Sequence, residues 1–83
     1  MYRIIVSLQA RREIRKIKSD YQEAINDAFK ELKENPFAGK PLVQELVNRY
    51  SYKLGNYRII YKINKKDKII QVLTAGHRSV VYK

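Results

Sequence analysis

The spacing of apolar residues changes along the chain, and the change predicts two helices followed by strands. Tyr2 to Val6 is a short apolar run of β-formers, which predicts an opening strand. Leu8 to Lys18 favours a short helix with one apolar stripe. From Ser19 to Asn35 the apolar residues follow one helix face, namely Tyr21, Ala24, Ile25, Ala28, Phe29 and Leu32. Two consecutive helices that meet near Ser19 form a helical hairpin.

Both ends of the second predicted helix carry local signals. Ser19 followed three residues later by Gln22 matches a capping box, in which the two side chains satisfy the first N–H groups of a helix. Asn35-Pro36 stops the helix, because proline restricts the residue before it and lacks an N–H. We expect residues 36–41 to form a loop.

After residue 48 the pattern takes the two-residue period of strands. Two alternating runs flank Gly55-Asn56, a dipeptide typical of tight hairpins. Ile69 to Ala75 is a mainly apolar run, as in a central strand. The order β-α-α-β-β-β predicts an α+β fold, a small antiparallel-dominated sheet with an N-terminal helical hairpin on one face. Because 83 residues leave no room for a second core, residues 1–83 should form a single domain.

The expected hairpin register gathers charges on one face of this sheet. If Gly55 and Asn56 are the loop residues, the numbers of paired residues sum to 111 and Lys53 faces Arg58. Alternation then separates two faces. The face expected to look outward holds Arg49, Ser51, Lys53, Arg58, Ile60 and Lys62. The face expected to pack on the helices holds Tyr50, Tyr52, Leu54, Tyr57, Ile59, Tyr61 and Ile63.

The charge of the chain points to a polyanionic partner. Eighteen Lys and Arg against eight Asp and Glu give a net charge of +10, and residues 49–83 hold nine basic residues but one acidic residue, Asp67. Like charges directly opposite each other destabilise a sheet, so their repetition on one face suggests that an anion binds there. This concentration favours nucleic acid or an acidic protein, with a plain solubility surface as the alternative.

Composition excludes several classes of site. The chain has no cysteine and one histidine, which removes disulfides, thiolate catalysis and iron–sulfur clusters and leaves little for a transition metal. We therefore expect neither cofactor nor metal. No apolar run approaches the roughly 18 residues of a membrane span, and no signal peptide is recognisable, so we expect a cytoplasmic protein.

The remaining candidate residues suit phosphodiester chemistry. The tail Gly76-His77-Arg78 is followed four residues later by Tyr82, and the basic face lies in the strands before it. Cleavage of RNA through its own 2′-hydroxyl needs a base, positive charge for the transition state and a proton donor, but no metal. A cluster of Lys, Arg, Tyr and His can supply these groups.

Taken together, these residues resemble the RelE/ParE superfamily of type II toxins, and within it the RelE-like mRNA interferases. The resemblance rests on the opening strand and helical hairpin, the run from Tyr52 to Tyr61, and the terminal Gly-His-Arg with Tyr82. It implies a microRNase-like fold, ribosome-dependent cleavage of mRNA in the A site, and neutralisation by a cognate acidic antitoxin. The partners expected are thus the antitoxin, the ribosome and mRNA.

The resemblance also implies roles for single residues. Lys53 matches a phosphate-binding lysine, and Arg58 matches the arginine that stabilises the transition state. Arg78 matches a tail arginine that stabilises charge or acts as an acid, and Tyr82 matches a base or orienting group. Ser51 stands where some RelE toxins carry another lysine. The residues expected to bind RNA or phosphate around the catalytic four are Arg49, Lys62, Ser51 and His77.

Two other functions remain open on the sequence. A ParE-like poison of DNA gyrase shares the fold without needing the catalytic cluster, although the tail tyrosine and the Lys53/Arg58 pair argue against it. A non-catalytic basic module that binds RNA or ribosomes would use aromatic side chains for stacking. The tyrosines from 50 to 61 fall instead on the face expected to pack on the helices.

Overall fold

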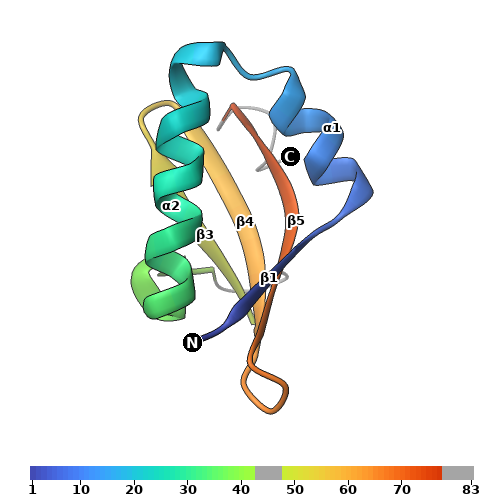
Figure 1. Ribbon diagram of the computed structural model, residues 1–83, viewed down its shortest axis with the longest axis vertical. Coiled ribbons are helices and arrows are strands. Elements are labelled where there is room, and N and C mark those ends of the chain that lie inside the picture. Colours follow the sequence, from blue (N-terminus) through green and yellow to red (C-terminus); the bar gives the residue numbers. More distant parts are fainter. Residues whose placement is uncertain (43–47, 78–83) are drawn as a thin grey trace.

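The computed structural model describes residues 1–42 and 48–77. Within these ranges one sheet is covered on one face by two α-helices (Figure 1). None of the helices in the described ranges is long and apolar enough to cross a bilayer. The elements in chain order are β1 (Arg3–Val6), α1 (Leu8–Arg15), the 3-10 helix η1 (Ser19–Tyr21), α2 (Gln22–Glu34), the 3-10 helix η2 (Pro36–Ala38), β2 (Lys40–Pro41), β3 (Arg49–Leu54), β4 (Tyr57–Asn64) and β5 (Ile69–His77).

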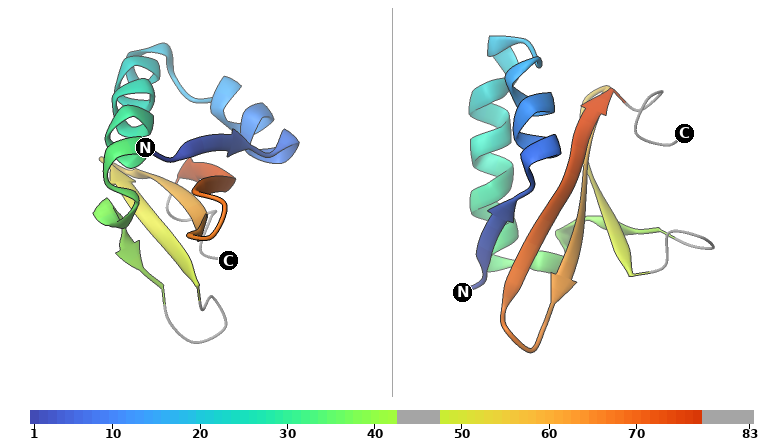
Figure 2. Two further views of the ribbon diagram at one scale, coloured as in Figure 1. Left: turned by 60° about the horizontal axis from the view of Figure 1, so that its bottom comes forward. Right: turned by 90° about the vertical axis from the view of Figure 1, so that its right-hand side faces the viewer.

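The sheet has the strand order β1-β5-β4-β3-β2 in the described residues. β1 runs parallel to β5 and the other neighbours are antiparallel. Both helices lie on the same side of the sheet (Figure 2). The predicted α+β fold, with its antiparallel-dominated sheet and helical hairpin on one face, is confirmed. The expectation of a plain loop over residues 36–41 is wrong, because this stretch forms η2 and then β2, which pairs with β3.

The β3–β4 hairpin has the predicted register. Its pairs run from Leu54 opposite Tyr57 to Arg49 opposite Lys62, so every pair of residue numbers sums to 111. Gly55 has φ +57°, a backbone angle that side chains other than glycine rarely adopt. A glycine with positive φ in the first loop position is the pattern of a type II′ hairpin turn. This two-residue turn places Lys53 directly opposite Arg58.

The core lies between the helices and the central strands. Its most buried members are Ala10 of α1, Ala28 and Leu32 of α2, Ile59 and Tyr61 of β4, and Ile70, Val72 and Ala75 of β5. The other hairpin residues predicted for this face, Tyr50, Tyr52, Leu54 and Ile63, are partly buried against the core. Tyr57 is half-buried and its ring contacts that of Tyr21, with 4.7 Å between ring centroids. The predicted packing face of the hairpin is thus confirmed.

The helix ends are fixed by bonds that cross between elements. Ser7 Oγ accepts from the Ala10 N–H and donates to the Leu73 carbonyl, both at 3.0 Å. The second bond falls where the β4–β5 register shifts by one residue, between Ile60 and Tyr61. Ser7 therefore caps α1 and ties it to the irregular part of β5.

The predicted capping box at Ser19 and Gln22 is wrong. α2 begins after the 3-10 turn η1, and neither helix start has a side-chain cap. Gln22 Nε2 donates instead to the carbonyls of Ile14 (2.9 Å) and Ile17 (3.2 Å), which end α1 and the turn after it. Gln22 thus joins the start of α2 to the end of α1 and the turn after it, and holds the helical hairpin closed.

A buried hydroxyl ties the segment after α2 to the sheet. Tyr61 Oη donates to the Pro36 carbonyl at 2.7 Å and accepts from the Gly39 N–H at 2.9 Å. A Cβ atom at Gly39 would collide with the Tyr61 hydroxyl and ring, so only glycine fits there. Burial raises the pKa of Tyr61 to about 12, because the phenolate would lose its hydration. η2 and β2 are therefore anchored on the centre of the core.

Candidate nucleic-acid interface

Two cations face each other at the tip of the β3–β4 hairpin. Lys53 is exposed and lies opposite Arg58, which is half-buried. Arg58 Nη1 donates to the carbonyls of Gly55 (2.8 Å) and Tyr57 (2.9 Å). These bonds hold the guanidinium against the turn but use one of its three nitrogens, and a guanidinium has five N–H donors in a planar fork. We call Lys53 and Arg58 the proximal pair.

A second set of polar side chains lies at the other end of the same face. Arg49 is opposite Lys62, and Lys62 is opposite Gln71 of β5. Lys62 and Gln71 are exposed and Arg49 is half-buried. Lys62 is four residues from Arg58 along β4, and at about 3.3 Å per residue the two backbone positions are about 13 Å apart. We call Arg49, Lys62 and Gln71 the distal set.

The middle of this face is buried, so the expectation that the whole face looks outward is wrong there. Ser51 and Ile60 lie opposite each other, and they are 6% and 5% exposed. An RNA-binding role for Ser51 stays a prediction, but its side chain belongs to a buried row rather than to an open surface. On the other side of Ser51, β2 contributes the exposed Lys40, a cation that the sequence interpretation missed because it read this stretch as a loop.

His77 lies on the opposite face of the sheet from the proximal pair. Its partner in the register is Tyr57, with ring centroids 6.1 Å apart, whereas Arg58 lies opposite Gly76. His77 lines a hollow of about 310 Å³ on the helix side, together with Glu13, Lys16, Ile17, Tyr57, Ala75 and Gly76. The structure therefore does not bring His77 together with Lys53 and Arg58, and its expected place beside the basic face is corrected.

Glu13 is a polar residue of this hollow that the sequence interpretation missed. Its Oε1 accepts from Thr74 Oγ1 at 2.7 Å and from the Ala75 N–H at 3.2 Å. The carboxylate thus occupies an edge of β5 beyond the end of β1. The one signal in the sequence is that Glu13 is the only acidic residue in a strongly basic α1. Within the described ranges, no three His, Asp or Glu side chains could jointly hold a metal ion.

Arg78 and Tyr82, the other two expected catalytic residues, lie outside the residues that the structure describes. β5 is described as far as His77, which directly precedes Arg78 in the sequence. Gly76 lies opposite Arg58, and His77, the last described residue, lies opposite Tyr57 beside the hairpin turn. The chain therefore runs toward Arg78 from the end of the sheet that holds the proximal pair.

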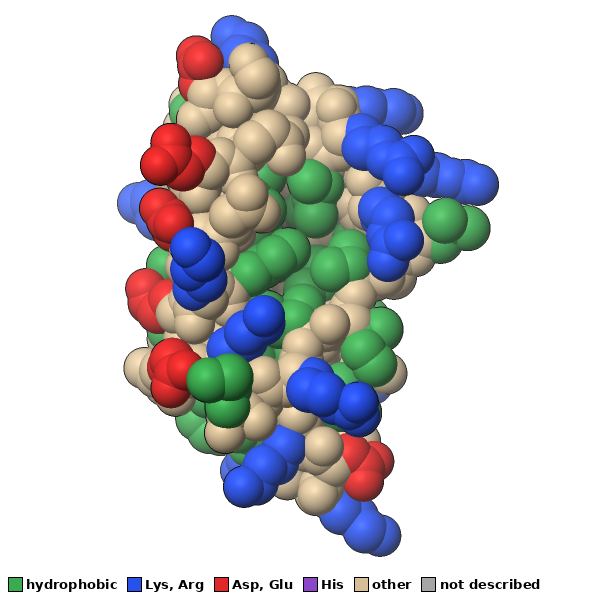
Figure 3. Space-filling model, viewed as in Figure 1, with side chains coloured by type: hydrophobic (Ala, Val, Ile, Leu, Met, Phe, Trp, Pro, Cys, Tyr) green, Lys and Arg blue, Asp and Glu red, His purple; other side chains and the backbone are tan. Residues whose placement is uncertain are grey.

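The helix side has a different charge pattern. Carboxylates gather along the outer side of α2 and cations gather over α1 (Figure 3). The exposed acids of η1 and α2 are Asp20, Glu23, Asp27, Glu31 and Glu34. Glu31 accepts a hydrogen bond from Tyr52 Oη at 2.9 Å, and burial followed by this bond raises the pKa of Tyr52. The acidic side of α2 would repel a polyanion, whereas α1 and the opposite face of the sheet both carry cations.

Comparison with known proteins identifies the family. The model of the ParE toxins of type II toxin–antitoxin systems matches residues 4–82. The chain belongs to the RelE/ParE superfamily of type II toxins. This toxin is 31% identical over 84 residues to Toxin RelG of Mycobacterium tuberculosis, covering 99% of this chain and 97% of RelG. It is 26% identical to Toxin RelE of the same organism, covering 99% and 87% of the two chains.

Solved structures confirm the predicted RelE-like fold of this toxin. A chain of the M. tuberculosis RelBE2 toxin–antitoxin complex superimposes with a TM-score of 0.85 at 32% identity, covering 93% of this toxin and 98% of that chain. The isolated RelE toxin of Escherichia coli gives a TM-score of 0.79 at 27% identity, with 99% and 92% covered. The superfamily expected from the sequence is therefore confirmed.

Proposed function

We propose that this toxin is a ribosome-dependent endoribonuclease that cleaves mRNA in the A site and so inhibits translation. The observation that carries the proposal is the proximal pair, Lys53 opposite Arg58, at the end of the sheet from which β5 leads to Arg78. The similarity to RelG and RelE over 99% of the chain supports the same assignment.

The proposed reaction uses the RNA as its own nucleophile. The 2′-oxygen bonds to the adjacent phosphorus while the bond from phosphorus to the 5′-oxygen breaks, leaving a 2′,3′-cyclic phosphate and a 5′-hydroxyl. The 2′-hydroxyl proton passes to a base, and the leaving oxygen takes up a proton from an acid. Because the nucleophile belongs to the substrate, no metal is needed to generate it.

Four side chains have the proposed catalytic roles. Lys53 holds the phosphate, and Arg58 and Arg78 stabilise the negative charge that develops on it. Tyr82 orients or deprotonates the 2′-hydroxyl. A free tyrosine has a pKa of about 10 and is a weak base at neutral pH, but neighbouring cations favour the phenolate. Positive charge along the path of the bound RNA would come from Arg49, Lys62 and Lys40.

A ParE-like poison of DNA gyrase is the second candidate, because the family model that matches residues 4–82 is that of the ParE toxins. This activity has no need for a pair of cations at the tip of the hairpin. The non-catalytic RNA-binding module is less well supported. Its stacking platforms would be the hairpin tyrosines, but Tyr61 is fully buried and Tyr52 is bonded to Glu31.

We also propose that an acidic antitoxin binds this toxin. The M. tuberculosis structure with 32% identity is a toxin–antitoxin complex. The net charge of +10 would attract an acidic partner, and the cations of the sheet face are its natural target.

Programmed ribosomes distinguish the two toxin activities. We expect wild-type toxin to cleave mRNA within the A-site codon, as mapped by primer extension, and to cause no gyrase-dependent breaks in supercoiled DNA. Lys53→Ala should slow cleavage, and the matched control Lys33→Ala, which removes an exposed charge from α2, should not. Gyrase-dependent breaks with intact mRNA would replace the proposal by its alternative.

A further inference from the structure

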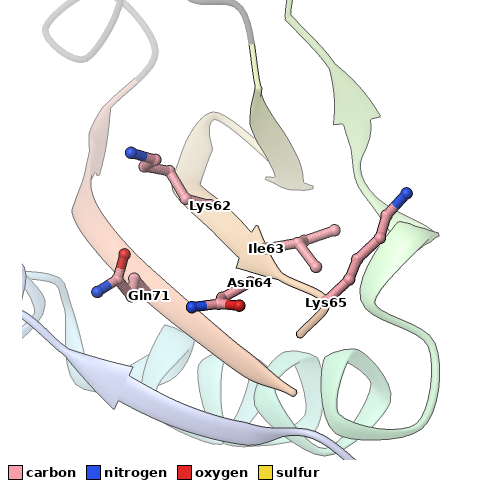
Figure 4. A pocket seen from close by; sticks show the side chains of 5 residues that line it. All are labelled: Lys62, Ile63, Asn64, Lys65 and Gln71. Atoms are coloured by element: carbon pink, nitrogen blue, oxygen red, sulfur yellow. The ribbon is translucent and has the colours of Figure 1, made fainter. Parts of the chain in front are cut away.

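Lys62 and Gln71 of the distal set line a hollow on the surface. The proposed function does not specify what binds in it. The hollow measures about 430 Å³ and lies where β4 ends and β5 begins (Figure 4). Its volume falls within the roughly 300–1,000 Å³ typical of small-ligand sites. Its lining combines cationic, amide and aliphatic side chains: Lys62, Ile63, Asn64, Lys65 and Gln71. We call it the distal pocket.

Two of the residues that line the distal pocket, Asn64 and Lys65, make contacts with neighbouring side chains. Asn64 Nδ2 donates to Asp67 Oδ2 at 3.1 Å, and Asn64 Oδ1 accepts from the Asp67 N–H at 3.0 Å. Asp67, the only acidic residue after residue 48, is not part of the lining, which holds two lysines and no carboxylate and is therefore net positive. Lys65 Nζ lies 5.3 Å from the centre of the Phe37 ring, a cation–π contact.

The lining offers the two kinds of contact that a nucleotide needs. Lys62 supplies an exposed ammonium, which pairs with phosphate as a point charge. Gln71, directly opposite Lys62, supplies an exposed amide that both donates and accepts hydrogen bonds, as the edges of bases require. The carboxylates of an acidic peptide would pair with the ammonium and accept from the amide N–H of Gln71, but only the peptide backbone could donate to its amide oxygen, whereas a base edge carries donor and acceptor side by side.

The distance between the two ends of the face sets the length of strand that reaches both. Arg58 and Lys62 are about 13 Å apart along β4, and the buried Ser51–Ile60 row separates them. A stacked strand advances about 3.4 Å per nucleotide, so this span corresponds to at most about four nucleotides. A single RNA strand can therefore place one phosphate at the proximal pair and another at Lys62.

We propose that the distal pocket is a second nucleotide subsite for single-stranded RNA, with Lys62 binding phosphate and Gln71 reading a base edge. The subsite lies up to four nucleotides from the phosphate at the proximal pair. Its place in catalysis rests on the proposed function, because that function puts the cleaved phosphate at the proximal pair. The binding of RNA by the subsite is measurable without cleavage.

The test is the dependence of RNA affinity on strand length. Fluorescence anisotropy would compare labelled 2′-O-methyl oligoribonucleotides of two and eight residues, which cannot be cleaved, on the free toxin. We expect the longer strand to bind more tightly to wild type. Lys62→Ala should weaken the longer strand by about tenfold, the size of one charge-assisted hydrogen bond, and should leave the shorter strand nearly unchanged. Lys33→Ala, an equal loss of charge on α2, should affect neither strand by more than about twofold, because surface charges far from the strand are screened.

Gln71→Ala provides a second test, because a general electrostatic effect would not change the preference of the toxin for one base over another. Among eight-residue oligomers differing in one base, it should reduce the spread of affinities by about fivefold or more, and circular dichroism should show an intact fold. The proposal is overturned if Lys62→Ala weakens both lengths alike or neither. It is also overturned if Lys62→Ala weakens polyglutamate as much as RNA, since the pocket would then be a protein-binding surface.

The same data separate this proposal from the proposed function. A length dependence that is lost in Lys62→Ala, in a toxin that does not cleave mRNA on ribosomes, would support the subsite and reject the nuclease. Cleavage on ribosomes with equal affinity for both lengths would support the nuclease and reject the subsite.

Discussion

Removal of the Tyr61 hydroxyl should destabilise the toxin strongly. Tyr61→Phe keeps the buried ring but leaves the Gly39 N–H and the Pro36 carbonyl without their partner. A buried polar group that loses its partner costs about 1–3 kcal/mol, so we expect a loss of about 2–4 kcal/mol at pH 7. A domain of this size has a total stability of only about 4–12 kcal/mol. The substitution should therefore remove a large share of it.

The raised pKa of Tyr61 adds a pH dependence with a defined sign. With a folded pKa of about 12 against about 10 for a free tyrosine, the folded chain holds the phenolic proton more tightly than the unfolded chain. The contribution of this group is complete below pH 10 and is lost as pH rises. Linkage gives a loss of about 1 kcal/mol at pH 11 and about 2 kcal/mol at pH 12. Tyr61→Phe has no such group, so its difference from wild type should shrink by these amounts.

Urea unfolding followed by far-ultraviolet circular dichroism measures both effects, because the chain has no tryptophan to serve as a fluorescent probe. With a denaturant slope of about 1–1.5 kcal/mol per molar, the expected loss shifts the midpoint by about 2 M. Tyr50→Phe, whose ring stacks on Tyr61 with centroids 5.6 Å apart, is the matched control and should cost no more than about 0.5 kcal/mol. Equal stability of Tyr61→Phe and wild type at pH 7, or a difference between them that stays constant from pH 10 to 12, would refute the reasoning.

Three further outcomes rest on single contacts or on net charge. Gly39→Ala should lower the unfolding midpoint in urea, because the new Cβ would collide with Tyr61; an unchanged midpoint would show that η2 moves freely. Ser7→Ala should lower the unfolding free energy by about 0.5–2 kcal/mol by removing the cap of α1, and Ser7→Thr should restore most of it. Association with an acidic antitoxin should slow as salt rises through about 0.1 M, where the screening length is about 10 Å; stopped-flow rates independent of salt would exclude electrostatic steering.

The hairpin was predictable because two local signals agree. The two-residue period of β3 and β4 determines which side chains share a face, and the Gly55-Asn56 loop determines which residues are opposite each other. The placement of Lys53 beside Arg58 needs nothing beyond these two signals. The parallel pairing of β1 with β5 rests on contacts distant in sequence, and no local pattern specifies it.

The sequence patterns also failed to predict other features that depend on tertiary contacts, because no local pattern specifies such contacts. β2 has two residues, one of them Pro41, which is too short for any period to be visible. Gln22 looks like part of a capping box, yet it serves the end of the preceding helix. Periodicity also says which face a side chain occupies but not what covers that face. It therefore left Ser51 on a face expected to be open, although the structure buries it.

The face of the sheet on which His77 lies could not be predicted without the length and register of β5. The sequence interpretation ended the last strand at Ala75 and treated His77 as part of a tail beside the basic face. In the structure β5 continues to His77, and a register shift near Ile60 sets its partner. The histidine consequently pairs with Tyr57 on the helix side. An added residue in a strand reverses the face of every later residue in that strand, and the sequence carries no local mark of it.

Single-turnover cleavage of mRNA on programmed ribosomes tests the central claim most directly. Arg78→Ala should lower the rate by on the order of 10²–10³, the usual cost of losing a donor that acts mainly in the transition state. Ribosome binding should fall much less, because the other cations remain. Tyr82→Phe keeps the ring and removes only the hydroxyl, so it should slow cleavage without loss of stability. Wild-type cleavage rates in both variants would contradict the catalytic assignment and leave the cationic face as a docking surface only.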